Sequence, residues 1–278
     1  MLARLQRKLN EVRRYPALGA AAADRRDLAA LALWRTRLLG PGTAAWLARG
    51  RNPVLTPRLR ATRGEPVRVT IGDYGEMDCF DELFIDGIYD LASVPFAPDL
   101  AVDCGAFRGY FTALAVGAFP AAAFACFEPN PAHQASLQAQ LALLSRPVEL
   151  VPAAVGPADG TATFAGEGMG GALTDGPAGA GACVVPVVDF ARWLDARRPQ
   201  RLVWKLDVEG AESTLLPATL SHLPASTALF LETHYDDAHC EKLLAPYRAA
   251  GFVVHEVRRR PARGFSYVEW RLLRHSPA

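Results

Sequence analysis

From residue 99 onward, the sequence alternates short apolar runs with segments of helical periodicity. The first two apolar runs, at residues 100–103 and 123–128, are each followed by a helical pattern. Strands that alternate with helices form βαβ units, in which parallel strands share a sheet with helices on both faces. The later apolar runs lie at residues 148–151, 183–188, 202–207, 228–232, 252–257 and 266–273. The sequence therefore predicts an α/β fold with a mainly parallel sheet flanked by helices.

The first 64 residues differ from the rest in charge. They contain 14 Lys and Arg against 3 Asp and Glu, whereas the other residues contain 16 against 26. Leucines recur there at helical spacing until a break at Gly40-Pro41-Gly42. We therefore predict a basic helical extension at residues 1–64 and an α/β domain at residues 65–278. Residues 165–182 are rich in Gly and Ala, which predicts a flexible loop within the wider loop segment at residues 160–182.

Three roles fit the basic extension. It could be a cap on the domain, a surface that recruits an anionic glycan, or a peripheral contact with anionic membrane. The cap is favoured because the arginines are spread around the predicted helices. A nucleic-acid partner is not expected, since no recognition motif or aromatic stacking array accompanies the basic residues.

The cysteines and the hydropathy of the sequence indicate which cellular compartment to expect. The five cysteines are odd in number and irregularly spaced, which predicts neither a disulfide framework nor a CxxC metal cluster. No apolar run reaches the roughly 20 residues of a membrane-spanning helix, and the amino terminus lacks a secretory pattern. We expect a cytoplasmic protein.

The motif Asp103-x-Gly105-x-x-x-Gly109 lies where the first predicted strand gives way to a helix. Glycines there let the backbone approach a ligand, and the helix start offers free N–H groups. A dinucleotide site would instead have G-x-G-x-x-G to hold a pyrophosphate. An acidic residue at the strand end suits a cofactor with an ammonium and a sulfonium, such as S-adenosylmethionine. On its own this pattern is also that of an ordinary structural turn.

Two further motifs follow later predicted strands. Glu128, in Phe127-Glu-Pro-Asn-Pro131, is placed to accept two hydrogen bonds from a ribose diol, or to cap the next helix. The segment 202–212 brings Lys205, Asp207, Glu209 and Glu212 to the end of another strand, where open α/β sheets bind ligands. So many charges beside a buried strand are costly unless they are paired or used.

With these motifs, the chain resembles the FkbM family of S-adenosylmethionine-dependent methyltransferases. The resemblance covers about residues 80–257 and includes Ala153-Ala-Val-Gly156, Lys205-Leu-Asp-Val-Glu-Gly-Ala-Glu212 and Leu231-Glu-Thr-His234. It implies a Rossmann-like class I methyltransferase domain with a seven-stranded sheet and a motif core at about residues 95–257. It also implies methylation of hydroxyls, often on sugars or polyketides.

The resemblance assigns the cofactor contacts residue by residue. Asp207 would lie near the transferred methyl group. The family usually has Asn and an aliphatic residue where this chain has Phe107 and Arg108. The other cofactor-binding residues would be Asp103, Gly105, Ala106 and Gly109 around the methionine, Glu128 at the ribose, and Ala154 and Val155 at the adenine. Asn130 is also expected to bind the cofactor.

An alcohol acceptor is a poor nucleophile at neutral pH and benefits from a general base. Asp207 or His234 is expected to accept the proton, because both lie at the ends of adjacent predicted strands. Glu209 would orient the acceptor or balance Lys205. His234 could instead only cap the following helix. His234, Asp236, Asp237 and His239 are too loosely spaced to predict a metal site.

Two other functions remain open at this point. A nucleotide-dependent oxidoreductase on a similar sheet is disfavoured by the missing G-x-G-x-x-G. A non-catalytic S-adenosylmethionine-binding partner or scaffold is disfavoured because the acidic residues of the motifs are present. The acceptor, a small molecule or a glycan, is not encoded in these motifs, since acceptor specificity in such folds resides in loops and appended segments.

Overall fold

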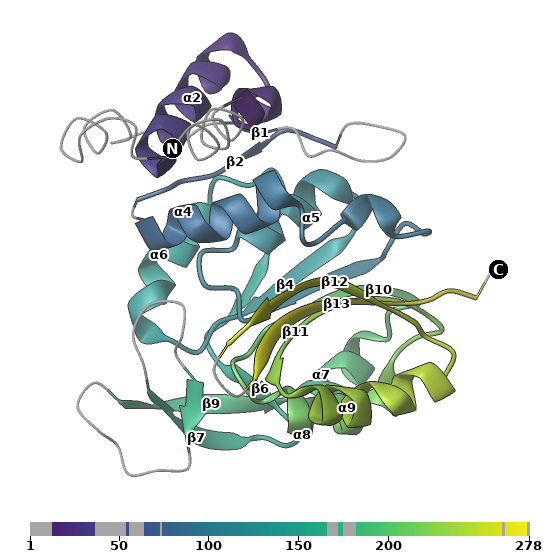
Figure 1. Ribbon diagram of the computed structural model, residues 1–278. Helices are drawn as coiled ribbons and strands as arrows, with labels where there is room; N and C mark the ends of the chain where they lie inside the picture. Colours follow the sequence, from purple (N-terminus) through teal and green to yellow (C-terminus); the bar gives the residue numbers. More distant parts are fainter. Residues whose placement is uncertain are drawn as a thin grey trace.

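The computed structural model describes residues 13–36, 54–55, 64–72, 74–165, 172–174, 182–262 and 265–276. A seven-stranded sheet runs through the α/β domain in the order β12-β13-β11-β10-β3-β4-β5 (Figure 1). Its neighbours are parallel except at β13, which pairs antiparallel with both β11 and β12. The strands are β3 (Leu100–Cys104), β4 (Ala123–Phe127), β5 (Glu149–Val151), β10 (Arg201–Leu206), β11 (Ser226–Tyr235), β12 (Val253–Pro261) and β13 (Ser266–Arg274). The predicted Rossmann-like, mainly parallel sheet is confirmed.

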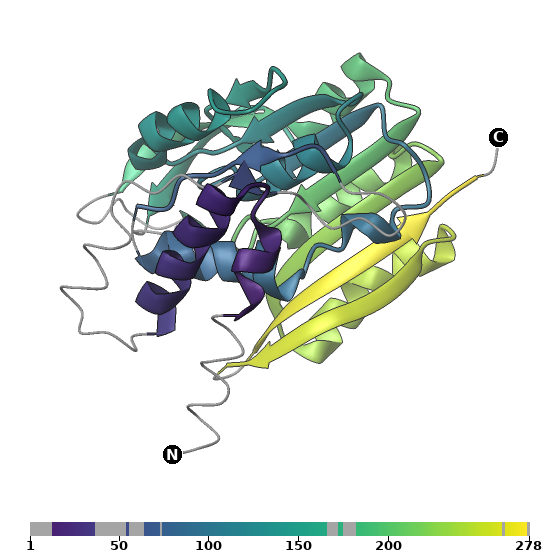
Figure 2. The ribbon, with the colours of Figure 1, turned by 90° about the horizontal axis from the view of Figure 1, so that it is seen from above.

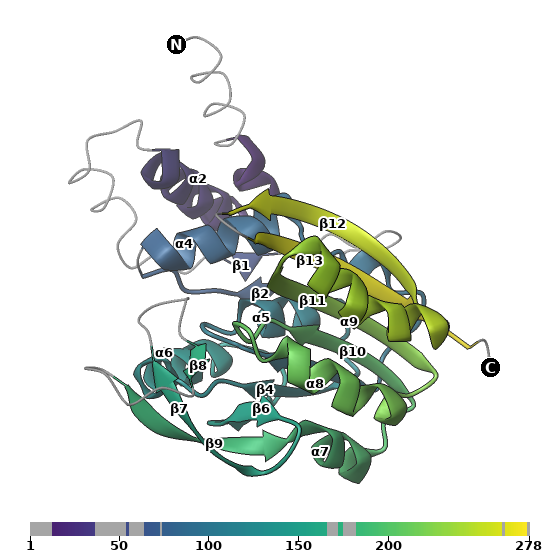
Figure 3. The ribbon, with the colours of Figure 1, turned by 60° about the horizontal axis from the view of Figure 1, so that its bottom comes forward.

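Helices cover both faces of this sheet. On one face, α5 (Tyr110–Ala118) packs with α4 (Tyr74–Phe80) in a single apolar cluster, and α6 (Pro131–Leu141) follows β4. On the other face, α7 (Phe190–Arg197), α8 (Glu212–Thr219) and α9 (Asp237–Ala249) share a second cluster (Figure 3). Strands such as β10 contribute side chains to both clusters, because successive side chains of a strand point to opposite faces of the sheet.

The segment predicted as a Gly-rich loop contains strands. β7 (Gly160–Ala165) and β8 (Ala172–Thr174) join β6 (Ala154–Gly156) and β9 (Cys183–Asp189) in a four-stranded sheet ordered β6-β9-β7-β8. Thr161 and Thr163 are β-branched residues that favour an extended backbone. Antiparallel pairing with β9 stabilises this conformation in β7. The loop prediction is therefore wrong for these residues, whereas residues 166–171 and 175–181 lie outside the described ranges.

Part of the basic extension packs against the domain. η1 (Pro16–Leu18) and α2 (Ala22–Thr36) lie beside α4 (Figures 1 and 2), and the fully buried Leu28 and Leu31 belong to the same cluster as Phe80. The remaining elements before β3 are β1 (Val54–Leu55), β2 (Val67–Arg68), the π-helical turn η2 (Asp81–Asp86) and η3 (Leu91–Ser93). The helical pattern before α2 lies outside the described residues, and the boundary at residue 64 stays a prediction.

No helix in these ranges is long and apolar enough to span a membrane.

The turn after β3 is packed directly against the turn after β10. Gly105 has φ +81°, and a Cβ at this position would lie 1.8 Å from the carbonyl oxygen of Asp207. The amides of Gly105 and Ala106 both donate to the carbonyl of Phe127, at 3.0 Å each, which ties the same turn to β4. Only glycine allows three strand ends to meet this closely.

We predict that Gly105→Ala destabilises the protein by about 3 kcal/mol, the sum of left-handed strain and overpacking. Gly87→Ala is the matched control, because Gly87 has φ +68° with open space around its Cβ position. Gly87→Ala should lower the free energy of unfolding by about 1 kcal/mol, the strain of a left-handed conformation alone. Urea denaturation midpoints measure both, and equal losses in the two variants would contradict the close-approach argument.

Candidate active site

A cavity of about 720 Å³ opens at the carboxyl ends of β3, β4, β10 and β11. Because β4 and β11 lie on opposite sides of the β3–β10 pair, the cavity crosses the sheet edge from Glu128 to Glu232. Most residues expected at the site line it: Asp103, Gly105, Ala106, Glu128, Ala154, Val155, Lys205, Asp207 and Glu209. Gly109, Asn130 and His234 do not line it.

Lys205 links the two acidic strand ends. Its Nζ lies 3.5 Å from Asp103 Oδ1 and 3.5 Å from Asp207 Oδ2, and donates to the Gly105 carbonyl at 2.5 Å. Burial lowers the pKa of Lys205, but the carboxylates of Asp207 and Asp103 raise it further, to a value above its usual one. Lys205 is therefore a fixed cation, and Glu209 does not balance it.

Asp103 is almost completely buried. Its Oδ2 accepts hydrogen bonds from the amide and the hydroxyl of Thr112, at 3.2 and 2.8 Å, which connects the strand end to α5. Burial raises the pKa of Asp103, while Lys205 and Thr112 lower it. Asp103 thus orients the turn and Lys205 at the cavity wall.

Glu128 holds the turn after β3 from the other side. Its Oε2 accepts from the Phe107 amide at 2.7 Å and its Oε1 accepts from the Asn130 amide at 2.9 Å. Each carboxylate oxygen has two lone pairs, so both oxygens retain capacity for a ligand hydroxyl. The cap of α6 is Asn130, whose Oδ1 accepts from the Ala132 amide at 3.0 Å. The capping role considered for Glu128 therefore belongs to Asn130.

Phe107 and Arg108 have specific settings in this turn. Phe107 has φ +49°, a left-handed conformation in which Asn is common and Phe is rare. The Glu128 hydrogen bond and an edge-on contact with the His133 ring, 4.8 Å between centroids, hold it there. Arg108 Nε lies 2.7 Å from Glu76 Oε1, so it fastens the turn to α4. The departures from the family pattern therefore leave the turn intact.

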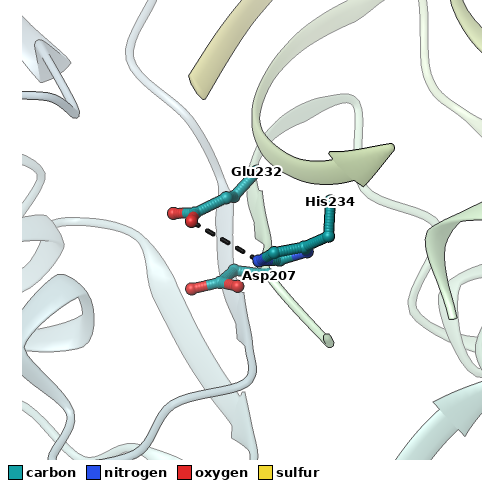
Figure 4. Close-up of side chains that lie close together, drawn as sticks. All are labelled: Asp207, Glu232 and His234. Atoms are coloured by element: carbon teal, nitrogen blue, oxygen red, sulfur yellow. Dashed lines mark ion pairs between the residues drawn. The ribbon is translucent and has the colours of Figure 1, made fainter. Parts of the chain in front are cut away.

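His234, near the end of β11, is surrounded by carboxylates. Its Nε2 lies 3.5 Å from Glu232 Oε1 (Figure 4). The same Nε2 lies 3.4 Å from Glu209 Oε2, and Nδ1 lies 3.9 Å from Glu212 Oε1. Burial lowers the pKa of His234, but Glu232 and Glu209 raise it to about 9. Burial, with Asp207 next, raises the pKa of Glu209 to about 7.

The other members of the His/Asp cluster that follows His234 have structural roles. Asp236 caps α9 by accepting from the His239 amide at 2.8 Å. Asp237 pairs with Arg259, and the His239 ring stacks on Tyr235 with centroids 4.2 Å apart. The helix cap considered for His234 is thus Asp236.

Several lining residues were not singled out from the sequence. Glu232 stands two residues before His234 in the quoted motif, so its strand-end position was a usable signal. Phe164 lies on β7, inside the segment mistaken for a loop, and carried no signal. The remaining ones include Glu82, Arg258, Arg260 and Tyr267, which come from η2, β12 and β13.

No protein-family model matches this sequence, and no curated protein matches it either. Among solved structures it is similar to methyltransferase FkbM from Methylobacillus flagellatus KT, with 14% identity and a TM-score of 0.44. That match covers 95% of this chain and 59% of the other, so this chain spans less than two thirds of that protein.

Two further solved structures are also similar to this chain. One is an O-methyltransferase family protein from Burkholderia thailandensis, with 12% identity and a TM-score of 0.43. That match covers 73% of this chain and 58% of the other. The other is an O-methyltransferase from Bacillus cereus in complex with SAH, with 9% identity, 64% and 75% coverage of this chain and that one, and a TM-score of 0.39.

We predict that Lys205→Met destabilises the protein by at least about 3 kcal/mol, because Asp103 is left buried and unpaired. Adding Asp103→Asn should recover most of this loss, since the uncompensated charge is then removed. Chemical denaturation of both variants measures the coupling. Equal destabilisation of the single and double variants would show that packing, not charge pairing, is what Lys205 contributes.

Proposed function

We propose that this protein transfers a methyl group from S-adenosylmethionine to a hydroxyl of a small molecule or glycan, as its resemblance to the FkbM family implies. The observation that carries the proposal is the single cavity that joins the Gly105 turn, the Glu128 carboxylate and the acidic end of β10. This arrangement offers a ribose acceptor and carboxylates for a cationic cofactor, and the turn lacks the three-glycine pyrophosphate motif of dinucleotide sites.

The cofactor would occupy the β3–β4 half of the cavity. Glu128 would accept the ribose hydroxyls, Ala154 and Val155 would face the adenine, and Phe164 would add an aromatic wall beside them. The turn at Gly105 and Ala106 would lie against the methionine part. The S-methyl group would then point toward Asp207 and Glu209, which line the cavity at the end of β10.

The acceptor would occupy the β11–β12 half. Arg258 and Arg260 each pair with Glu82 there, at 2.9 Å, and the three side chains present both donors and acceptors. The Arg260 guanidinium carbon lies over the Tyr267 ring, 5.2 Å from the ring centroid. Tyr267 thereby adds a flat apolar surface. Paired charges and an aromatic ring suit a polyhydroxylated acceptor such as a sugar.

The transfer itself is an in-line displacement. An acceptor oxygen forms its bond to the methyl carbon as the carbon–sulfur bond breaks, and the sulfur keeps the electron pair as a thioether. The hydroxyl proton passes to a carboxylate. Glu209 is assigned this role because it lines the cavity, whereas Asp207 Oδ2 is held by Lys205 and His234 does not line the cavity. Most of the rate enhancement would come from alignment of donor and acceptor.

We predict that Glu209→Gln lowers turnover by about 10²-fold to 10⁴-fold, the usual contribution of a general base. Affinity for S-adenosylhomocysteine should stay within about 2-fold, since Glu209 contacts only the acceptor side in this assignment. S-adenosylhomocysteine release with a panel of hydroxylated acceptors measures turnover, and Glu241→Gln, an exposed carboxylate on α9, is the control.

If Glu209→Gln kept full turnover while Asp207→Asn lost it, the base would be Asp207 and the Glu209 assignment would be wrong. Cofactor binding without turnover on any acceptor would favour the non-catalytic partner instead.

A further inference from the structure

Three potential metal ligands converge at the acceptor side of the cavity. Asp207, Glu232 and His234 each direct one ligand atom into a common space, with all three atoms within 4.8 Å of one another (Figure 4). Asp207 follows β10, and the other two lie on β11, its parallel neighbour. The parallel register of β10 and β11 therefore places these side chains together at the carboxyl edge of the sheet.

The ligand atoms themselves are poorly satisfied. Asp207 Oδ1 and both ring nitrogens of His234 are buried and make no hydrogen bond to the described residues. His234 Nε2 and Glu232 Oε1 are 3.5 Å apart, longer than a good hydrogen bond. Buried polar atoms without partners are uncommon in native proteins and are a recognised sign of a missing ion or water.

Charge around this point also favours a cation. Lys205 pairs with only one oxygen of Asp207, Oδ2, and the other oxygen, Oδ1, has no hydrogen-bond partner among the described residues. In the described residues, Lys205 pairs with Asp103 and Asp207, and Arg258 and Arg260 pair with Glu82, Glu232 and Glu269. Glu209 and Glu212 lie beside His234. The seven carboxylates named here outnumber the three Lys and Arg side chains named with them.

We propose that Asp207, Glu232 and His234 bind one divalent transition metal of the manganese-to-zinc series. One imidazole and two carboxylates form a mixed nitrogen and oxygen set, which such ions accept, whereas Mg²⁺ prefers oxygen ligands alone. Metal–ligand distances of about 2.0–2.2 Å require ligand atoms about 3 Å apart. The three ligand atoms lie within 4.8 Å of one another, so side-chain rotations would have to bring them closer around the ion. This replaces the expectation of no metal and differs from the loosely spaced cluster at residues 234–239.

The open coordination positions face the cavity, because Asp207 and Glu232 both line it. A hydroxyl or vicinal diol of the acceptor can occupy them, and a bound metal both orients the oxygen and favours loss of its proton to Glu209. This use of the metal rests on the proposed methyl transfer. Metal binding itself does not, and it is measured without cofactor or acceptor.

The test is titration of the chelator-treated protein with Mn²⁺, in which the electron paramagnetic resonance signal measures the free Mn²⁺. We expect one saturable site, and electron spin-echo envelope modulation of the bound ion should show an imidazole ¹⁴N coupling in the unaltered protein. In His234→Gln the ¹⁴N coupling should vanish, and in Glu232→Gln the Kd should rise at least about 10-fold. His239→Gln is the matched control, since it removes a neighbouring imidazole that stacks on Tyr235.

Absence of a saturable site or of the ¹⁴N coupling in the unaltered protein would overturn the proposal. So would a coupling that survives in His234→Gln or disappears in His239→Gln, because the imidazole would then be a different one. Circular dichroism identifies any variant that fails to fold, and the spectrum of the unaltered protein decides the question in that case. Since no cofactor is present, a negative result leaves the methyltransferase proposal standing and overturns only the metal.

Discussion

The buried ammonium of Lys205 is the interaction on which the candidate site depends. It pairs with Asp103 and Asp207 and donates to the Gly105 carbonyl, so it joins the turns after β3 and β10. Those turns touch so closely that Gly105 tolerates no Cβ. A buried cation between two carboxylates is stable only while all three are present. The position of Asp207 in the cavity is therefore a consequence of its ion pair with the buried Lys205 at the edge of the sheet.

The sequence predicted the sheet well because its signals are local. Strand-length apolar runs and helical periodicity show which segments are strands and which are helices, and acidic residues after parallel strands must gather at one edge. The antiparallel insertion of β13 depends on long-range pairing, which no local pattern encodes. The cavity end formed by Glu82, Arg258 and Arg260 was missed for the same reason, since these residues are far apart in the chain.

The charge asymmetry of the sequence has a partial structural explanation. Arg14 pairs with Asp86 at 3.2 Å, and Arg35 pairs with Asp78 at 2.9 Å, so basic residues of the extension meet acidic residues of α4 and η2. Both arginines and Tyr15 also line the cavity. The extension thus supplies part of the cavity wall, and in the proposed function we expect it to influence acceptor choice. Its surface for glycan or membrane contact stays a prediction.

The most direct test of the central claim is calorimetric titration of the protein with S-adenosylhomocysteine, beside NAD and a nucleotide sugar. The account predicts selective binding of S-adenosylhomocysteine, weakened at least about 10-fold by Glu128→Ala through loss of hydrogen bonds to a charged acceptor. Glu241→Ala, an exposed change on α9, should leave the affinity unchanged. Absence of binding, or a preference for NAD, would contradict the account and leave the Gly105 turn a purely structural feature.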